Sequence, residues 1–264
     1  MNGAIEISYA RLGLAYLGLL LPFLVLFLLS TGQLSAAVIA VLRMTLQLSL
    51  VGLYLEVLFR LDSPYLNTLW VVVMLFVSAG TIVRRTGLAL RLLFLPALAA
   101  MGVAVVFADL FFLGVVVHME HLLTARYLIP ITGMLLGNCL QANIVGLDSY
   151  FRRISEERIR YQFFLCCGAT RSEALRPFFR DAVRRALDPV IANVSVIGLI
   201  SLPGMMTGQI LGGSSPSVAI RYQIMIMVAI FFTATMGVMA CIIFSRRFAF
   251  DAFDRLKPGL FRAS

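Results

Sequence analysis

Charged side chains are scarce in this sequence: they make up 13% of its 264 residues, about half of their share in a soluble domain. Hydrophobic residues make up 61% of the chain, and the mean hydropathy is +0.95. This composition excludes a soluble enzyme, a disordered chain and a secreted disulfide scaffold. The long apolar runs indicate instead a protein whose solvent is the lipid bilayer.

Motifs for catalysis and for nucleotide binding are also missing. The four cysteines form no C-x-x-C pair, so neither a zinc site nor a redox motif is expected. The chain has no G-x-x-x-x-G-K-S/T loop and no H-E-x-x-H motif, so we expect no catalytic residue and no cofactor in this chain. The net charge of +9 does not predict binding to nucleic acid, because excess arginine in a membrane protein usually marks cytoplasmic loops.

Seven apolar segments are long enough to cross a hydrocarbon core of about 30 Å. The first segment has no basic leader, so we expect a retained helix and not a cleaved signal peptide. The sequence therefore predicts an all-α, polytopic membrane protein in contact with lipid, with residues 1–264 as a single transmembrane domain. The seven expected spans are Leu12–Leu29, Ala37–Phe59, Leu66–Val83, Leu92–Val117, Tyr127–Leu147, Val190–Leu211 and Tyr222–Phe244.

The basic residues predict the orientation. Seventeen of the 22 lysines and arginines follow the third, fifth and seventh spans, and with seven spans these three regions lie on one side. The positive-inside rule makes that side cytoplasmic. The N-terminus is therefore expected outside and the C-terminus inside, with the chain in the cell inner (plasma) membrane. Residues 148–188 are the largest basic region, with nine arginines, and form the expected cytoplasmic segment.

This cytoplasmic segment carries the signals of two short helices joined by a tight turn. Ser155 is expected to cap the first helix, which would end at Gly168, where glycine can adopt a left-handed conformation. Thr170 and Glu173 have the spacing of a capping box that starts the second helix. Pro177 should limit or restart that helix.

The same segment contains an apolar cluster, formed by Phe163, Phe164 and Leu165. An exposed apolar cluster requires something to cover it. Two interpretations stay open: a docking element for a cytoplasmic partner, or a basic helical loop that lies on the lipid headgroups.

Span six contains a helix break at Pro203 and Gly204, which is tolerated at membrane depth only beside protein or a cavity. Glycines 204, 208 and 212 also repeat every four residues, which permits close helix packing. The helix break favours a translocation path, and the glycine repeat favours close helix packing. The two interpretations are compatible. Embedded polar and thioether side chains near such breaks are candidates for the path. The candidates are Gln47, Glu56, Asp109, Met134, Asn138, Pro203, Met205, Met206 and Gln223.

A weak metal-binding pattern lies on the expected outer side. His118 and His121 flank Glu120 at a spacing that could hold a metal on one helical turn. Loops at a membrane edge often contain histidine, so this is a hypothesis only. Four methionines, Met205, Met206, Met225 and Met227, are thioethers that can bind soft metals, although packing explains most methionines in such a chain.

Several stretches together resemble the FetB-type ABC transporter permeases, a family associated with bacterial metal (iron) export. The span-two stretch R-M-T-L-Q-L-S-L-V-G begins at Arg43, and the span-five stretch I-P-I-T-G-M begins at Ile129. The turn C-G-A-T at residues 167–170 is similar to the family's L-G-A-T. The most specific stretch is G-L-I-S-L-P-G-M-M-T-G-Q-I-L-G-G-S-S-P-S-V-A-I-R-Y-Q-I, at residues 198–224.

The resemblance implies a homodimeric permease that works with a separate cytoplasmic ABC ATPase, which binds ATP and Mg²⁺. It implies that the segment around Gly168, Ala169 and Thr170 docks on that ATPase, with Phe163, Phe164 and Glu173 beside it. The bacterial members imply iron as the cargo. Plant relatives are linked to aluminium tolerance and nucleotide-sugar transport, so a nucleotide sugar or another small solute stays open. A stand-alone secondary transporter, using Glu56 or Asp109 as an ion site, is the alternative from a different class.

Overall fold

A computed structural model describes residues 8–30, 32–119, 121–199 and 202–261, and within these ranges the chain is helical, as expected. Isolated β-bridges join Leu88 to Phe261 and Phe250 to Leu256. The helices are α1 (Tyr9–Leu17), α2 (Leu20–Leu28), α3 (Leu34–Leu61), α4 (Pro64–Arg85), α5 (Leu90–Asp109), the π-helix η1 (Leu110–Val116), α6 (Ala125–Glu156), α7 (Arg158–Cys166), α8 (Arg171–Val196), α9 (Gly204–Leu211) and α10 (Pro216–Ala249).

Six helical segments among the described residues are long and apolar enough to cross a membrane. They contain or overlap six of the seven expected spans. These segments are Ala10–Leu28, Leu34–Leu61, Pro64–Arg85, Leu90–Val116, Ala125–Glu156 and Pro216–Ala249. The remaining expected span, Val190–Leu211, is not one helix. It is divided between the end of α8 at Val196 and the start of α9 at Gly204, and its residues 200–201 lie outside the described part of the chain.

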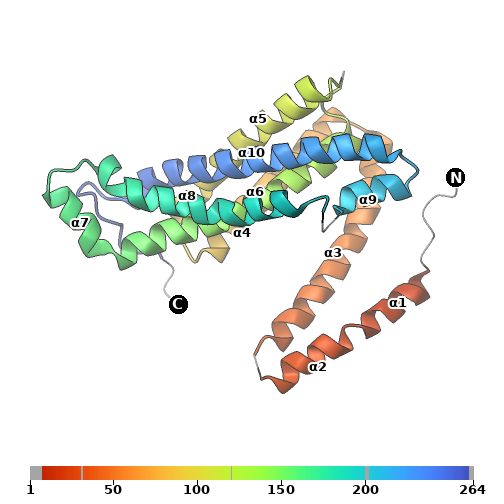
Figure 1. The fold of residues 1–264 in the computed structure, drawn as a ribbon, viewed down its shortest axis with the longest axis horizontal. Helices are drawn as coiled ribbons and strands as arrows, with labels where there is room; N and C mark the ends of the chain where they lie inside the picture. Colours follow the sequence, from red (N-terminus) through yellow and green to blue (C-terminus); the bar gives the residue numbers. More distant parts are fainter. Residues whose placement is uncertain (1–7, 31, 120, 200–201, 262–264) are drawn as a thin grey trace.

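Helices α4, α5, α6, α8 and α10 form an elongated bundle with the core along its axis (Figure 1). The two longest helices, α6 and α10, pack against each other, and α5, α8 and α9 all pack against α10. Tyr150 and Phe151 of α6 and Phe178 of α8 are among the largest fully buried side chains. The C-terminal half of α6 is thus part of the same core as the apolar spans.

The first three helices form a hairpin that leaves the bundle (Figure 1). Helices α1 and α2 form one arm and α3 the other; α2 packs against α3, and no residue in the most apolar stretch of either arm is buried. The hairpin is held at one end, where Leu58 of α3 packs with Ala125 and Ile129 of α6. Most of its apolar surface therefore needs lipid or another chain to cover it.

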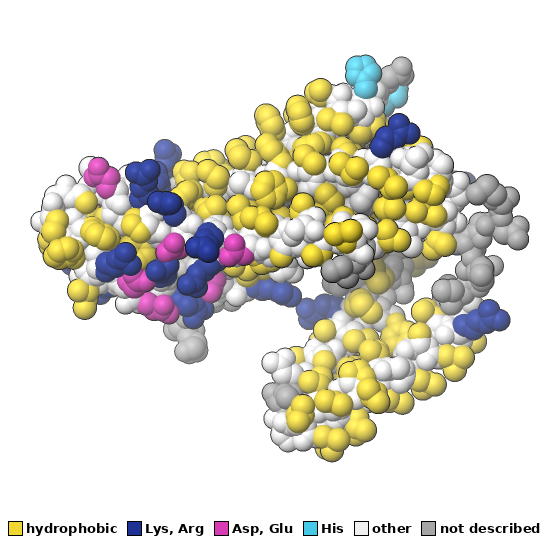
Figure 2. Space-filling model, viewed as in Figure 1, with side chains coloured by type: hydrophobic (Ala, Val, Ile, Leu, Met, Phe, Trp, Pro, Cys, Tyr) yellow, Lys and Arg dark blue, Asp and Glu magenta, His cyan; other side chains and the backbone are white. Residues whose placement is uncertain are grey.

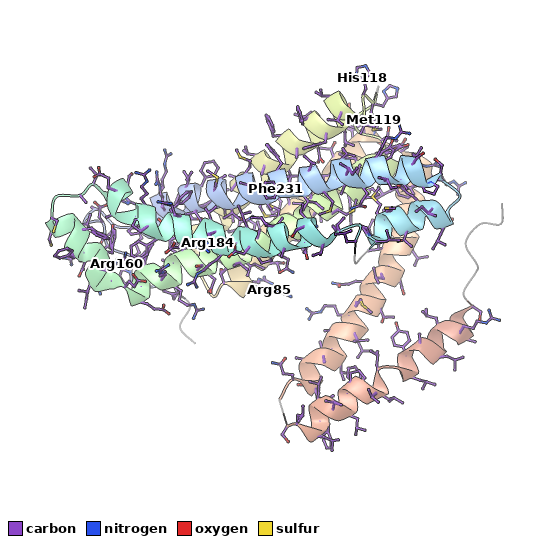
Figure 3. The ribbon with its side chains drawn as sticks, in the orientation of Figure 1. Arg85, His118, Met119, Arg160, Arg184 and Phe231 are labelled. Atoms are coloured by element: carbon purple, nitrogen blue, oxygen red, sulfur yellow. The ribbon has the colours of Figure 1, made fainter. Side chains whose placement is uncertain are left out.

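Charge is concentrated at one end of the molecule. Figure 2 shows the lysine, arginine and acidic side chains gathered around α7 and the start of α8, and hydrophobic side chains over the middle. Arg160 and Arg184 lie toward this end, whereas His118 lies at the tip beyond α5, at the opposite end (Figure 3). This separation agrees with a cytoplasmic end and an outer end of a spanning protein.

Candidate functional site

The turn between α7 and α8, the elbow (residues 167–170), has the expected local geometry. Gly168 has a φ of +87°, which a glycine adopts without a steric penalty. The capping box is complete: the Glu173 N–H donates to Thr170 Oγ1 at 3.4 Å, and the Thr170 N–H donates to Glu173 Oε2 at 2.8 Å. These bonds satisfy amides that the start of α8 leaves free, so the turn is fixed by its own residues.

Two expectations about this segment are wrong. Ser155 does not cap a helix, because α6 continues to Glu156. The bend comes at Glu157, whose carboxylate accepts hydrogen bonds from Arg153 and Arg160, both at 2.7 Å. These two arginines lower the pKa of Glu157. Pro177 does not limit α8 either, because the helix continues through it to Val196.

An apolar face of α7 points away from the core at the charged end. Ile159 is 85% exposed and Phe163, one turn later, is 63% exposed. Phe164 is partly buried against the core, and the Arg160 guanidinium lies 5.7 Å from its ring centroid. Of the two phenylalanines expected to dock, Phe163 is thus the exposed one, and Ile159 extends the same face.

Arg171, the first residue of α8, joins the elbow to the end of α10. Its guanidinium donates to the Arg246 carbonyl oxygen at 2.5 Å, pairs with the Asp254 carboxylate at 3.3 Å and lies 4.5 Å from the Phe250 ring centroid. Tyr161 of α7 adds a hydrogen bond to the Asp254 carbonyl oxygen at 2.8 Å. These contacts form what we term the Arg171 clamp, which ties the elbow to the end of α10 and the tail that follows.

The break between α8 and α9 opens a cavity of about 290 Å³ among α6, α8, α9 and α10. Five of the nine expected path residues line this cavity, and they come from three helices and the break itself. They are Met134, Asn138, Pro203, Met205 and Gln223. The structure therefore brings together residues that are distant in the sequence: Met134 and Gln223 are 89 positions apart.

Gln223 is the most buried polar side chain of the cavity, with 7% of its surface exposed. Its Oε1 atom has no hydrogen-bond partner in the described part of the chain. An unpaired amide oxygen in a membrane core costs free energy unless something binds it. Gln223 therefore makes the cavity a candidate binding site.

The structure does not bring every expected path residue to this cavity. Gln47 and Glu56 are exposed on α3, within the hairpin that leaves the bundle. Met206 follows Met205 on α9 but does not line the cavity.

Asp109 occupies a second, smaller cavity at the junction of α5 and η1. It is 9% exposed, and its Oδ2 atom accepts a hydrogen bond from the Thr132 hydroxyl at 2.7 Å, while Oδ1 is buried without a partner among the described residues. The cavity of about 200 Å³ is lined almost wholly by apolar side chains. The π-helix that follows Asp109 is a geometry common at functional sites.

The histidine pair gains no support as a metal site. His118 and His121 lie in the loop after η1, and Glu120 between them lies outside the described residues. Within the described ranges, no group of three histidine, cysteine or acidic side chains is placed to hold a metal ion. The triad stays a prediction.

The comparison with protein families gives one match, which covers residues 9–250 and is described as the uncharacterised protein family UPF0014. This chain belongs to that family. Its curated relatives include the probable iron export permease protein FetB of Escherichia coli, 31% identical over 208 residues that cover 78% of each chain. They also include the UPF0014 membrane protein YjkA of Bacillus subtilis, 29% identical over 90% of this chain and 92% of the relative. The plant relative STAR2 of Oryza sativa is 35% identical over 71% of this chain and 65% of its own length. No solved structure matches.

For this UPF0014 member, sequence reasoning missed three residues of the two sites. Ile159 lies on α7 beside the elbow, Arg171 directly follows the elbow, and Asn193 lines the cavity. The i, i+4 spacing to Phe163 was the available signal for Ile159. The other two depend on which helices meet, which no local pattern in the sequence specifies. Met227, one of the thioethers named from the sequence, also lines the cavity.

Proposed function

We propose that this chain is the permease subunit of an ABC exporter, driven by a separate cytoplasmic ATPase that binds ATP and Mg²⁺. The observation that carries the proposal is the exposed apolar face of Ile159 and Phe163 on α7, which lies at the charged end beside the capped turn of the elbow. No nucleotide motif occurs in the chain. The similarity to FetB, a protein named as a permease, supports a transport role.

The proposed transport path is the cavity at the helix break. Both α9 and the C-terminal half of α8 run beside α10 (Figure 1). We assign these two helical pieces together to the sixth of seven membrane crossings. With seven crossings the N-terminus lies outside and the C-terminus inside an inner (plasma) membrane. Movement of the elbow would reach the cavity through α8 and, by way of the Arg171 clamp, through α10.

We further propose that the permease is a homodimer. Its support is the hairpin α1–α3, whose apolar surface exceeds what its own chain covers. A second copy beside the hairpin would cover part of this surface, and lipid would cover the rest.

The proposed cargo is a metal, with iron as the first candidate, because the relative FetB is named a probable iron export permease. A nucleotide sugar or another small solute is the alternative cargo for the same ABC permease.

The docking proposal is tested by capturing the ATPase on the purified chain. Phe163→Ser should abolish capture and ATPase stimulation, because it removes the centre of the apolar face. Tyr65→Ser is the matched control, since Tyr65 is an aromatic residue that is 89% exposed at the start of α4. Equal capture by the two variants would contradict docking at α7.

A second candidate function rests on Asp109, whose buried carboxyl group has one unpartnered oxygen. Buried carboxyl groups in membranes often carry protons in ion-driven transporters. Transport by vesicles that hold this chain alone, abolished by Asp109→Asn, would support that function. Transport that requires the ATPase would exclude it.

A further inference from the structure

The cavity at the helix break is lined by thioethers from three different helices. Met134 lies on α6, Met205 on α9 and Met227 on α10. Carboxamide side chains from three helices complete the polar part of the lining. They are Asn138, Asn193 and Gln223. The donor atoms available to a ligand are therefore sulfur and amide oxygen or nitrogen.

No charged side chain lines this cavity within the described residues. Asp109 belongs to the separate cavity at η1, and the histidines lie at the outer tip. Desolvating an ion in a membrane core costs several kcal/mol or more, and the cost rises steeply with ionic charge. A cavity without carboxylates offers little to offset that cost for a divalent or trivalent cation.

Thioethers discriminate between metals by softness. Soft sulfur ligands such as methionine favour Cu(I), whereas carboxylate and carbonyl oxygens suit Mg²⁺, Ca²⁺ and Mn²⁺, and imidazole suits iron. The described lining of this cavity offers thioether sulfur and has neither a carboxylate nor an imidazole. Its chemistry thus matches a soft ion of single charge.

The position of Gln223 adds an independent observation. Its Oε1 atom is buried and unpaired on the cavity wall, one turn of α10 before Met227. Helical spacing of i, i+4 puts these two side chains on the same face of α10. An incoming cation would satisfy the unpaired oxygen and meet the Met227 sulfur beside it.

We propose that this cavity binds a soft monovalent metal ion, Cu(I) or its analogue Ag(I), through Met134, Met205 and Met227, with Gln223 as the amide ligand. The proposal rests on the proposed permease function and names the class of its cargo. It also distinguishes this chain's cavity from a site for ionic iron, which the donor set does not fit.

The test is Ag(I) binding to the purified full-length chain in detergent, with Cys166→Ser and Cys167→Ser in every preparation, because these exposed free thiols would bind Ag(I) themselves. The chain with its native methionines, which is the wild type for this test, should bind Ag(I) stoichiometrically, with sulfur neighbours visible by X-ray absorption at the silver edge. The triple variant Met134→Leu/Met205→Leu/Met227→Leu should lose about tenfold or more in affinity, since even loss of outer-shell partners costs about 10–100-fold in metal sites. Leucine conserves the volume, so the fold should persist, and thermal unfolding checks this.

Met236→Leu is the matched control, because Met236 lies on the same helix, is 46% exposed and does not line the cavity. Equal Ag(I) affinity in this variant and in the triple variant overturns the proposal. Fe²⁺ binding that the triple variant weakens, without any Ag(I) binding, also overturns it.

Capture of the ATPase is measured on the same preparations, so that the two proposals fail separately. If wild type and triple variant both capture the ATPase and neither binds Ag(I), the soft-metal site is wrong and the permease assignment stands. If the cavity methionines bind Ag(I) and no ATPase is captured, the soft-metal site stands and the ABC assignment is wrong.

Discussion

At the residue scale, the carboxylate of Glu173 makes the start of α8 sensitive to pH. Hydrogen bonds from the Thr170 hydroxyl and backbone N–H lower the pKa of Glu173 below its ordinary value. Because the pKa is lower in the folded state, the hydrogen bonds to the carboxylate stabilise the elbow fully above about pH 4.3, the usual glutamate pKa. This stabilisation is lost as the pH falls through the lowered pKa of the folded state. We expect amide hydrogen exchange at the start of α8, corrected for intrinsic rates, to rise in acid. In Glu173→Gln this pH dependence should disappear; if it persists unchanged, another group is responsible.

Single residues of the elbow could be predicted from the sequence where the signal is local. The left-handed turn at Gly168 and the capping box of Thr170 and Glu173 both involve residues no more than four positions apart. Their spacing in the sequence was therefore enough to predict them. The predicted helix cap at Ser155 was wrong because tertiary packing determines where α6 ends. Ile154 is 1% exposed in the core, and burial of that turn extends α6 past a residue that would otherwise start a helix.

At the scale of helices, the Arg171 clamp should couple the elbow to α10. Arg171→Ala removes the pair with Asp254, the bond to the Arg246 carbonyl and the contact with Phe250. We expect the ATPase still to bind, because the face of α7 is unchanged, and transport per ATP hydrolysed to fall by about 5-fold or more, the lower end of typical coupling between sites. Transport and ATPase rates in vesicles measure this ratio.

The control for this prediction is Arg176→Ala on the same helix. Arg176 is exposed, and the structure shows no partner for it among the described residues. The clamp would be contradicted if both alanine variants left the ratio unchanged, or if both lowered it equally.

The contact between α6 and α10 depends on a glycine. A Cβ atom at Gly237 would lie 2.4 Å from Cys139 Sγ, so Gly237→Ala should destabilise the chain by about 1–3 kcal/mol through overpacking. Gly102→Ala is the control, because no atom lies within 4 Å of a Cβ at that position. Thermal unfolding in detergent should show a lower midpoint for the Gly237 variant alone, and equal midpoints would contradict the contact.

The sequence predicted the helix break at Pro203, since proline and glycine act on their own backbone, but it did not predict which glycines pack. Gly204 and Gly208 have the repeat that favours close approach, yet nothing lies within 4 Å of a Cβ at either position in the described chain. Gly237 has no such repeat. Packing depends on which faces meet in three dimensions, and the spacing along one helix does not contain that information.

At the scale of the whole molecule, hydropathy and charge predicted the all-helical membrane class and the gathering of basic residues at one end. They did not predict that α1–α3 would leave the bundle (Figure 1). A helix that faces lipid and one that faces protein have the same apolar composition, because lipid tails are as apolar as leucine. This is why Gln47 and Glu56 appeared as path candidates with the same weight as Gln223.

The orientation of the molecule can be tested with its own cysteines. Cys166 and Cys167 are exposed at the charged end beside the elbow, whereas Cys139 and Cys241 are buried. If this end is cytoplasmic, a membrane-impermeant maleimide should not label the native chain in intact cells and should label it in inverted vesicles stripped of the ATPase. Moving the thiol to the other end, with His121→Cys in a Cys166→Ser/Cys167→Ser background, should reverse the pattern, because His121 is exposed in the opposite loop. Labelling of the native chain from outside would contradict the cytoplasmic elbow and, with it, the site at which the ATPase is proposed to dock.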